Sequence, residues 1–185
     1  MIKLQENPSS HLVIAYNQMM EVMRNAYEHS KDDSMTLQKA VNRARQQAVD
    51  TGAVTVDEAY EIGEYIKRDI NDAAEHMMES SNEFHDWLML DIEVIERKVI
   101  DLFLSVADHT RIELENFSQR NTEAETDSRY AAVYRSGEVT GPGTLICEYC
   151  GEIKPFLSSD HISDCTRCGH DAFIRRRSSN NRDRP

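Results

Sequence analysis

The four cysteines of the chain are the residues whose type and spacing point most directly to chemistry. They lie in one 22-residue window as two C-x2-C pairs separated by 14 residues: Cys147, Cys150, Cys165 and Cys168. Two such pairs bring four thiolates to the corners of a tetrahedron, at Zn–S distances of roughly 2.3 Å. A glycine follows each pair (Gly151 and Gly169), which permits a tight turn that points backbone amides at the sulfurs. The spacing therefore predicts one zinc ion held by four cysteines in a zinc ribbon.

The same four thiols are compatible with other chemistry. Iron also occupies tetrahedral sites of four thiolates. Two disulfides are a further alternative, which a cytosolic chain disfavours. A redox dithiol needs one C-x2-C in a thioredoxin-like setting, and no βαβ pattern surrounds either pair. Because four cysteines leave no open position for water, the predicted zinc is structural and not catalytic.

Up to about residue 118 the sequence predicts helices throughout. Apolar residues recur at alternating spacings of three and four, which gives each helix one apolar seam. The seams run from Leu12 to Ala26, Leu37 to Ala48, Val56 to Met77 and Leu88 to Val106. We expect three or four helices packed as antiparallel hairpins in a coiled-coil-like bundle. The break between the last two seams is weak, so they form either two helices or one bent helix.

Polar residues and glycines mark the ends of these elements. Residues 32–34 offer an N-cap for the second helix, and Thr51-Gly52 ends it. Thr55 and Glu58 form a capping box, in which hydroxyl and carboxylate satisfy orphan amides at a helix start. Beyond residue 135, glycines break any helix, and three short strands are expected near 144–146, 153–157 and 172–174.

The sequence thus predicts a mainly α protein with a small C-terminal β zinc ribbon. The expected divisions are an acidic helical region (1–118), a linker or helix extension (119–135), the zinc ribbon (136–177) and a disordered basic tail (178–185). The ribbon has few apolar residues, so it needs a metal to fold securely.

The net charge of −12 lies entirely in the helical region. Residues 1–118 hold 23 acidic and 11 basic residues, and residues 119–185 hold ten of each. This distribution repels nucleic acid and anionic membranes. The run Arg175, Arg176 and Arg177 is the exception and could contact a polyanion. A solubilising edge strand is the favoured interpretation, because edge charges deter pairing with other chains; docking of the arginines on the acidic helices is a third option.

Other candidate sites are weaker. His170, directly after the second pair, is expected just outside the coordination shell of the metal or at the surface. The remaining histidines lack the Glu-x-x-His spacing of di-iron bundles. Nothing matches a P-loop, a dinucleotide-binding fingerprint or a nucleophile–base motif, so we expect no enzyme. Without a signal peptide or an apolar run of roughly 18 residues, we expect a cytoplasmic protein with no membrane partner.

The C-terminal segment resembles a known family. The residues that carry the resemblance are Tyr134-x-Ser136-Gly137-Glu138-Val139-x-Gly141-x-Gly143-x-Leu145-x-Cys147-x-x-Cys150 and Cys165-x-x-Cys168-Gly169-His170-x-x-Phe173-x-Arg175-Arg176. They are similar to the bacterial zinc-ribbon-containing YbeL-like family, in which an acidic helical region also precedes the ribbon. The resemblance implies a cytoplasmic, metal-binding protein with these four ligands, and it offers no active site to carry over.

We therefore expect a non-catalytic zinc protein that acts as a macromolecular interaction module. Exposed helical seams would recruit a protein partner or a second copy of the chain. The alternative is a zinc ribbon that binds nucleic acid or the transcription machinery through its C-terminal arginines, with binding that weakens steeply in salt. A weaker alternative is zinc or redox sensing by the cysteines.

Overall fold

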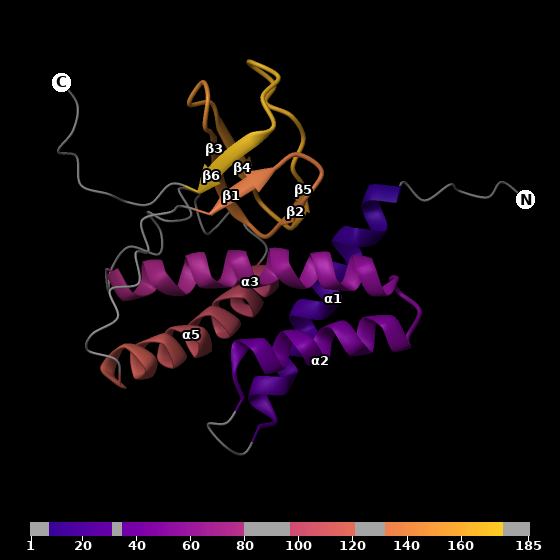
Figure 1. Ribbon diagram of the computed structural model, residues 1–185, viewed down its shortest axis with the longest axis vertical. Coiled ribbons are helices and arrows are strands. Elements are labelled where there is room, and N and C mark those ends of the chain that lie inside the picture. Colours follow the sequence, from indigo (N-terminus) through magenta and orange to yellow (C-terminus); the bar gives the residue numbers. More distant parts are fainter. Residues whose placement is uncertain (1–7, 31–34, 80–96, 121–131, 176–185) are drawn as a thin grey trace, which may run out of the picture.

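A computed structural model describes residues 8–30, 35–79, 97–120 and 132–175 of the chain, and places helices before two small sheets (Figure 1). The helices are α1 (Pro8–Glu28), α2 (Leu37–Asp50), α3 (Val56–Glu79) and α5 (Arg97–Arg120). The strands are β1 (Val133–Arg135), β2 (Val139–Thr140), β3 (Gly143–Cys147), β4 (Ile153–Phe156), β5 (Asp160–His161) and β6 (Ala172–Arg175). The expected mainly α fold with a small C-terminal β unit is confirmed.

The ends of α2 and α3 show how local sequence fixes these helices. Thr36 caps α2, accepting a hydrogen bond from the Lys39 amide at 3.3 Å. The N-cap predicted within residues 32–34, which lie outside the described ranges, is therefore wrong. The capping box of α3 is confirmed. The Thr55 amide donates to the Glu58 carboxylate at 2.8 Å, and the Glu58 amide donates to the Thr55 hydroxyl at 3.3 Å.

The apolar seams of the described helices face one another in a single core. Fully buried members include Tyr16, Met23, Val41, Ile66 and Val106. The expectation that exposed seams recruit a partner is therefore wrong for these residues, because the chain covers them itself. The sequence left open whether the last two seams form one bent helix or two helices. That prediction falls on residues 80–96, which lie outside the described ranges.

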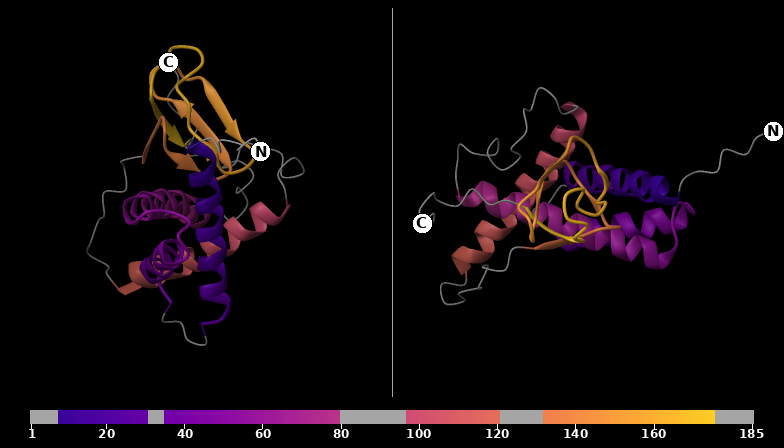
Figure 2. Two further views of the ribbon diagram at one scale, coloured as in Figure 1. Left: turned by 90° about the vertical axis from the view of Figure 1, so that its right-hand side faces the viewer. Right: turned by 90° about the horizontal axis from the view of Figure 1, so that it is seen from above.

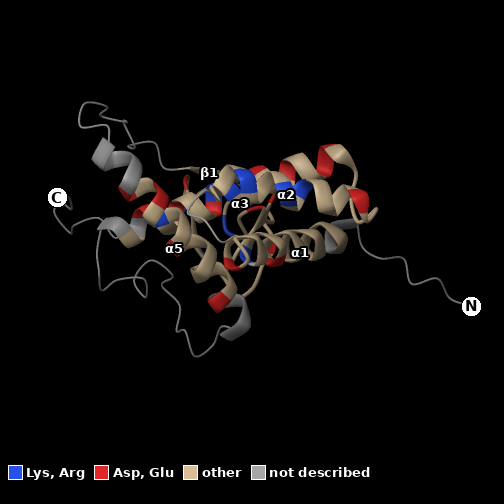
Figure 3. Ribbon diagram, turned by 90° about the horizontal axis from the view of Figure 1, so that it is seen from below, with Lys and Arg blue, Asp and Glu red and all other residues tan. Residues whose placement is uncertain are grey.

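The helices cross rather than run as one parallel bundle. α2 and α3 lie side by side as a hairpin, and α1 crosses them steeply (Figures 1 and 2). α1 packs against α2, α3 and α5, and α3 also packs against α5. Acidic residues recur along the helical surface seen from below (Figure 3). No helix in the described ranges combines the length and apolarity needed to cross a membrane.

The ribbon is a four-stranded antiparallel sheet in the order β1-β6-β3-β4, accompanied by the two-stranded pair β2-β5. The three expected strands are present as β3, β4 and β6. In the register, Cys147 lies opposite Phe173, and Leu145 lies opposite Arg175. β1 pairs with β6, so the sheet begins at Val133, before the expected boundary at residue 136 and inside the expected linker.

The ribbon rests directly on the helices. β2 contacts α1 and α3, and β5 contacts α1. Val139 of β2 is fully buried and belongs to the core of the helices rather than to that of the ribbon. The core of the ribbon is small and includes two of the cysteines, its buried members being Tyr134, Leu145, Cys147, Phe156, Ile162, Cys165 and Phe173. The fold therefore joins two cores through a shared junction.

Candidate metal centre

Two tight turns position the cysteines, one after β3 and one before β6. In each turn the glycine amide donates to the carbonyl of the first cysteine, at 2.9 Å for Gly151 to Cys147 and 2.8 Å for Gly169 to Cys165. Both glycines have positive φ, 72° and 73°, a conformation that L side chains rarely adopt. The amides of Cys147 and Cys165 donate in turn to carbonyls five residues ahead, both at 2.9 Å. The same knuckle is thus built twice.

The two knuckles bring the four sulfur atoms together. All four Sγ atoms lie within 4.8 Å of one another, with Cys147–Cys168 at 3.6 Å and Cys150–Cys165 at 3.5 Å. Sulfurs around a tetrahedral zinc with Zn–S bonds of about 2.3 Å lie about 3.8 Å apart. The spacing fits a tetrahedral metal ion and far exceeds a disulfide bond of about 2.05 Å. Among the described residues, no other group of three or more metal-ligating side chains converges in this way.

Backbone amides and neighbouring thiols control the ionisation of the cysteines. Burial raises the pKa of Cys165, but the amides of Cys168 and Arg167, with the neighbouring thiols, outweigh it and lower the pKa to about 6. The His170 amide favours the Cys168 thiolate, yet desolvation and the other three thiols raise the pKa of Cys168 to about 12. The cluster thus forms one thiolate readily and resists a further negative charge. A dication removes that resistance, and the donor set of four thiolates suits zinc.

His170 contacts the site through its backbone and not through its imidazole. Its amide points at the Cys168 sulfur, and its carbonyl accepts from the Cys165 amide. The imidazole stacks on the Tyr149 ring, with ring centroids 5.3 Å apart and an angle of 27° between the planes. Tyr149 is 76% exposed, so the two knuckles present an aromatic pair to solvent.

A second constellation lies between the ribbon and the helices, around Asp69 of α3. This carboxylate is fully buried and accepts from the Tyr16 hydroxyl and the Gly141 amide, both at 2.7 Å. The Thr140 hydroxyl lies 3.4 Å from the same oxygen. Desolvation, together with Asp69, raises the pKa of Tyr16 well above its ordinary value, so this hydroxyl remains a donor at neutral pH. One helical carboxylate thereby ties α1 and the loop after β2 together.

Arg68 connects the neighbouring side of the junction. Its guanidinium pairs with Glu138 and lies over the Tyr134 ring, 3.8 Å from the centroid. Burial opposes its charge, but Asp69, Tyr134 and Glu138 outweigh this effect and raise the pKa of Arg68. The Tyr134 hydroxyl donates to Asp72 at 2.8 Å. Tyr134 belongs to the ribbon core, so it links that core to α3.

Arg175 departs from its expected role. It is 3% exposed and donates to the Pro142 carbonyl at 3.0 Å and the Thr140 hydroxyl at 2.8 Å. Its Nη2 lies 3.9 Å from the Asp69 carboxylate. The predicted polyanion contact is wrong for Arg175, because a buried guanidinium cannot reach a ligand in solution. The edge-strand interpretation is also wrong, because β6 lies between β1 and β3.

The contacts of Arg175 match the third option given by the sequence, which is docking of the arginines on the acidic helices. Arg176 and Arg177, together with the predicted tail at 178–185, lie outside the described residues, so their predicted role is neither supported nor opposed. Burial opposes the charge of Arg175, but Tyr134, Asp69 and Asp72 raise its pKa. The arginine is therefore a charged group held inside the junction.

At two positions of the ribbon the backbone lies so close to side chains of this junction that glycine is required. A Cβ at Gly141 would lie 2.9 Å from the Phe103 ring and 3.0 Å from the Tyr16 hydroxyl. A Cβ at Gly143 would lie 2.3 Å from the Arg175 guanidinium. The Gly-Pro-Gly segment, which marks a turn in the sequence, thus lets the ribbon backbone lie against helices and arginine.

The sequence interpretation missed the junction residues, although two signals were present. Asp69 lies three residues after Ile66 and four before Ala73, which is seam spacing. A carboxylate at such a position indicates a buried charge that needs partners. The second signal is the motif around Glu138 and Gly141, which contains more defined residues than the metal knuckles alone would require. Neither signal identifies the partner, since the contacts join residues about 70 positions apart.

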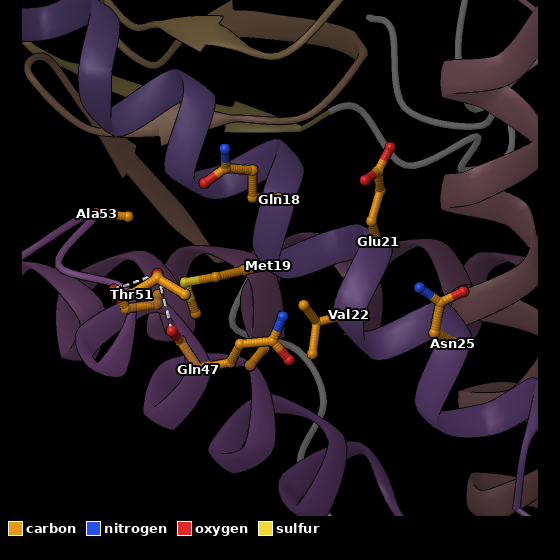
Figure 4. Close-up of a pocket in the computed structure, with 10 residues that line it drawn as sticks. Gln18, Met19, Glu21, Val22, Asn25, Gln47, Thr51 and Ala53 are labelled. Carbon is orange, nitrogen blue, oxygen red and sulfur yellow. Dashed lines mark hydrogen bonds between the residues drawn. The ribbon is translucent and has the colours of Figure 1, made fainter.

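The described helices also carry a pocket of about 470 Å³ between α1 and α2, shown in Figure 4. Gln18, Asn25 and Gln47 contribute amides to its lining, and Met19 and Val22 contribute apolar surface. Glu21 is the one ionisable residue among those that line it. The pocket therefore offers polar contacts but no acid–base pair.

A small sheet that carries two glycine-containing cysteine knuckles, docked on crossing helices, defines a zinc-ribbon protein with a helical base. A family model described as "Zinc-ribbon containing domain" matches residues 24–177, and the chain belongs to this family. It is 29% identical over 156 residues to the protein YbeL of Escherichia coli strain K12, covering 84% of this chain and 92% of the relative. The YbeL proteins of strains O6:H1 and O157:H7 give the same values. No solved structure gives a significant match.

Proposed function

We propose that the protein is a non-catalytic zinc protein that binds another protein through the exposed end of its ribbon. One zinc ion is held by Cys147, Cys150, Cys165 and Cys168. Four thiolates fill its coordination sphere, so the metal fixes the fold and activates no water. The proposal places the chain in the cytoplasm, where thiols stay reduced and available to the metal.

The observation that carries the binding role is the aromatic pair formed by Tyr149 and His170. Tyr149 is the most exposed of the large hydrophobic residues of the described chain, at 76%. Its backbone lies between two metal ligands in a knuckle fixed by hydrogen bonds, so little entropy is lost when a partner covers the ring. Rigid exposed aromatic residues are typical anchors of protein interfaces.

The charge around the pair indicates a cationic partner. Residues 132–175 contain six acidic and four basic residues, and Arg175, one of the four, is buried. Zinc with four thiolates adds a net charge of −2. An aromatic ring in negative surroundings attracts the guanidinium or ammonium of an arginine or lysine side chain. The same charge repels nucleic acid, so a basic protein segment is the favoured partner.

Binding of a labelled hexa-arginine peptide to the zinc-loaded full chain tests this proposal, with fluorescence anisotropy as the readout. Tyr149→Ala should weaken binding about tenfold, or about 1.4 kcal/mol, through loss of the cation–π contact. The control is Leu157→Ala, which removes another exposed apolar residue of the ribbon (46% exposed) and should leave affinity unchanged. Equal affinity for wild type and Tyr149→Ala would refute the assigned surface.

A single-stranded RNA oligonucleotide in place of the peptide, in the same assay, tests the second candidate function, which is binding of nucleic acid. Bases also stack on aromatic rings, and the exposed Arg167 adds one positive charge to the second knuckle. We expect no RNA binding at 150 mM salt, because the described ribbon repels phosphate. RNA binding that depends on Tyr149 and falls with salt would replace the protein partner by a nucleic acid.

A further inference from the structure

The junction around Asp69 is tied to the metal centre by one short strand. β6 begins at Ala172, four residues after Cys168, and ends at Arg175. Along this strand Phe173 lies opposite Cys147, and Arg175 lies opposite Leu145. Arg175 is therefore only about 7 Å along the strand from the residue paired with a metal ligand. Both the ligands and the buried arginine depend on the pairing of β3 with β6.

We propose that metal binding by the four cysteines controls docking of the ribbon on the helices, so that metal loss withdraws Arg175 from Asp69 and uncovers a face of α1, α3 and α5. This inference rests on the proposed zinc site and adds a conformational consequence to it. The uncovered face comprises Tyr16, Asp69 and Phe103, which now contact Gly141 or lie beside it.

The ribbon depends on the metal because its own core is too small. Of its seven buried core residues, two are the ligands Cys147 and Cys165. A unit of this size lacks the apolar area to fold securely, and a structural zinc contributes on the order of 10 kcal/mol to such units. Without the ion, the cysteines no longer hold β3 and β6 together. Loss of their pairing removes the support of Arg175.

The docked face depends on the ribbon in turn. Val139 completes the core of the helices, and the Gly141 amide supplies one of the hydrogen bonds to the buried Asp69. Withdrawal of Arg175 and of this amide leaves the carboxylate with Arg68, 3.4 Å away, and the Tyr16 hydroxyl as its partners, and water must replace the partners that are lost. Water then reaches Tyr16 and Phe103. The helical seams away from the junction remain covered by their own partners, so the helices stay folded while the ribbon undocks.

Hydrogen exchange measured by mass spectrometry on the full chain tests the inference. The zinc-loaded protein is compared with the same protein after chelation and after zinc is restored. We expect the segments around Tyr16, Asp69 and Phe103 to exchange about tenfold faster in the metal-free chain, together with the ribbon, and to recover with zinc. α2 packs mainly against α1 and α3, and its Leu37 amide also donates to Glu113 of α5 at 2.8 Å. It serves as the internal reference and should keep its protection.

The variant Gly141→Val distinguishes undocking of the ribbon from loss of the metal ion. Its side chain collides with Phe103 and Tyr16 but lies outside the knuckles, so the same helical segments should exchange faster while zinc stays bound. The control Leu157→Ala should behave as wild type. Unchanged helical protection in the metal-free chain overturns the proposed coupling, and so does loss of α2 protection, which signals global unfolding. A chain that takes up no zinc refutes the metal site itself and the coupling with it.

Discussion

The side chains of Arg175 and Asp69 meet inside the junction between ribbon and helices, with Nη2 3.9 Å from Oδ1 and exposed fractions of 3% and 0%. The two residues come from strand β6 and helix α3. Neither charge is accessible to solvent, so each depends on the other and on the polar groups around them. This relationship joins the ribbon to the helices through two buried groups of opposite charge.

The first prediction follows from the cost of leaving one member of this pair alone. Asp69→Ala should destabilise the protein by about 3–5 kcal/mol, because it strands a buried guanidinium and removes the acceptor for Tyr16 and Gly141. Asp69→Asn keeps an acceptor oxygen and should cost less. Urea denaturation measures both losses. Asp101→Ala, at an exposed aspartate of α5, is the control, and a loss below about 1 kcal/mol for Asp69→Ala would contradict the pairing.

The second prediction concerns alkaline pH. Burial raises the pKa of Tyr27 to about 12, and it raises the pKa values of Tyr16 and Tyr134 well above their ordinary value. These tyrosines ionise near pH 10 in the unfolded chain, while the folded chain keeps its protons. Their contribution to stability is therefore complete below pH 10 and is lost as pH rises through the folded pKa.

For Tyr27 the loss of stability between pH 10 and pH 12 amounts to about 3 kcal/mol. Denaturation followed by circular dichroism from pH 8 to pH 11 should show a stable plateau and then a steep decline. Tyr27→Phe should flatten the decline, whereas Tyr60→Phe, at a ring that is 60% exposed, should not. Identical slopes for Tyr27→Phe and wild type would disagree with the burial of this hydroxyl.

Elements and ligands that depend on local pattern could be predicted from the sequence. The seams of α1, α2 and α3, the capping box at Thr55 and Glu58, and strands β3, β4 and β6 each follow from residues close together in the chain. The convergence of the four cysteines likewise follows from two local spacings and a glycine after each. In these cases the physical cause lies within one or two helical turns or one hairpin.

The sequence offered docking of the arginines on the acidic helices only as a third option. It could not identify the partners, because docking depends on pairs far apart in sequence. Arg175 resembles the start of an exposed basic run, and only the position of β6 inside the sheet, with Asp69 opposite, makes it a buried charge. β1 was missed because three residues carry too little periodicity to indicate a strand. The inference that the seams are exposed was wrong for most seam residues of the described helices, for the same reason: packing of α1 against α2, α3 and α5 buries them.

The third prediction uses the knuckle glycines. At Gly169 φ is 73° and a Cβ would meet nothing within 4 Å, so Gly169→Ala adds backbone strain without a collision. The expected cost is about 1–2 kcal/mol, seen as zinc affinity about 5–30-fold weaker in competition with a chelator. Gly169→Asn should cost less, because asparagine tolerates positive φ better than alanine. Unchanged affinity for Gly169→Ala would mean that the turn relaxes without strain.

The last prediction addresses the metal itself. Wild-type protein should contain one zinc per chain by elemental mass spectrometry, with iron absent, and cobalt(II) substitution should give the absorption of a tetrahedral thiolate site. Cys165→Ser replaces a thiol whose pKa is about 6 by a hydroxyl that stays protonated at pH 7. It should weaken zinc binding by more than about 100-fold, beyond the 10–100-fold typical of changes next to metal ligands. Thr166→Ala, in the same knuckle but outside the coordination shell, should retain full zinc content. Zinc bound to Cys165→Ser as tightly as to wild type would exclude the four-cysteine site, and iron in place of zinc would change the metal while leaving the ligands in place.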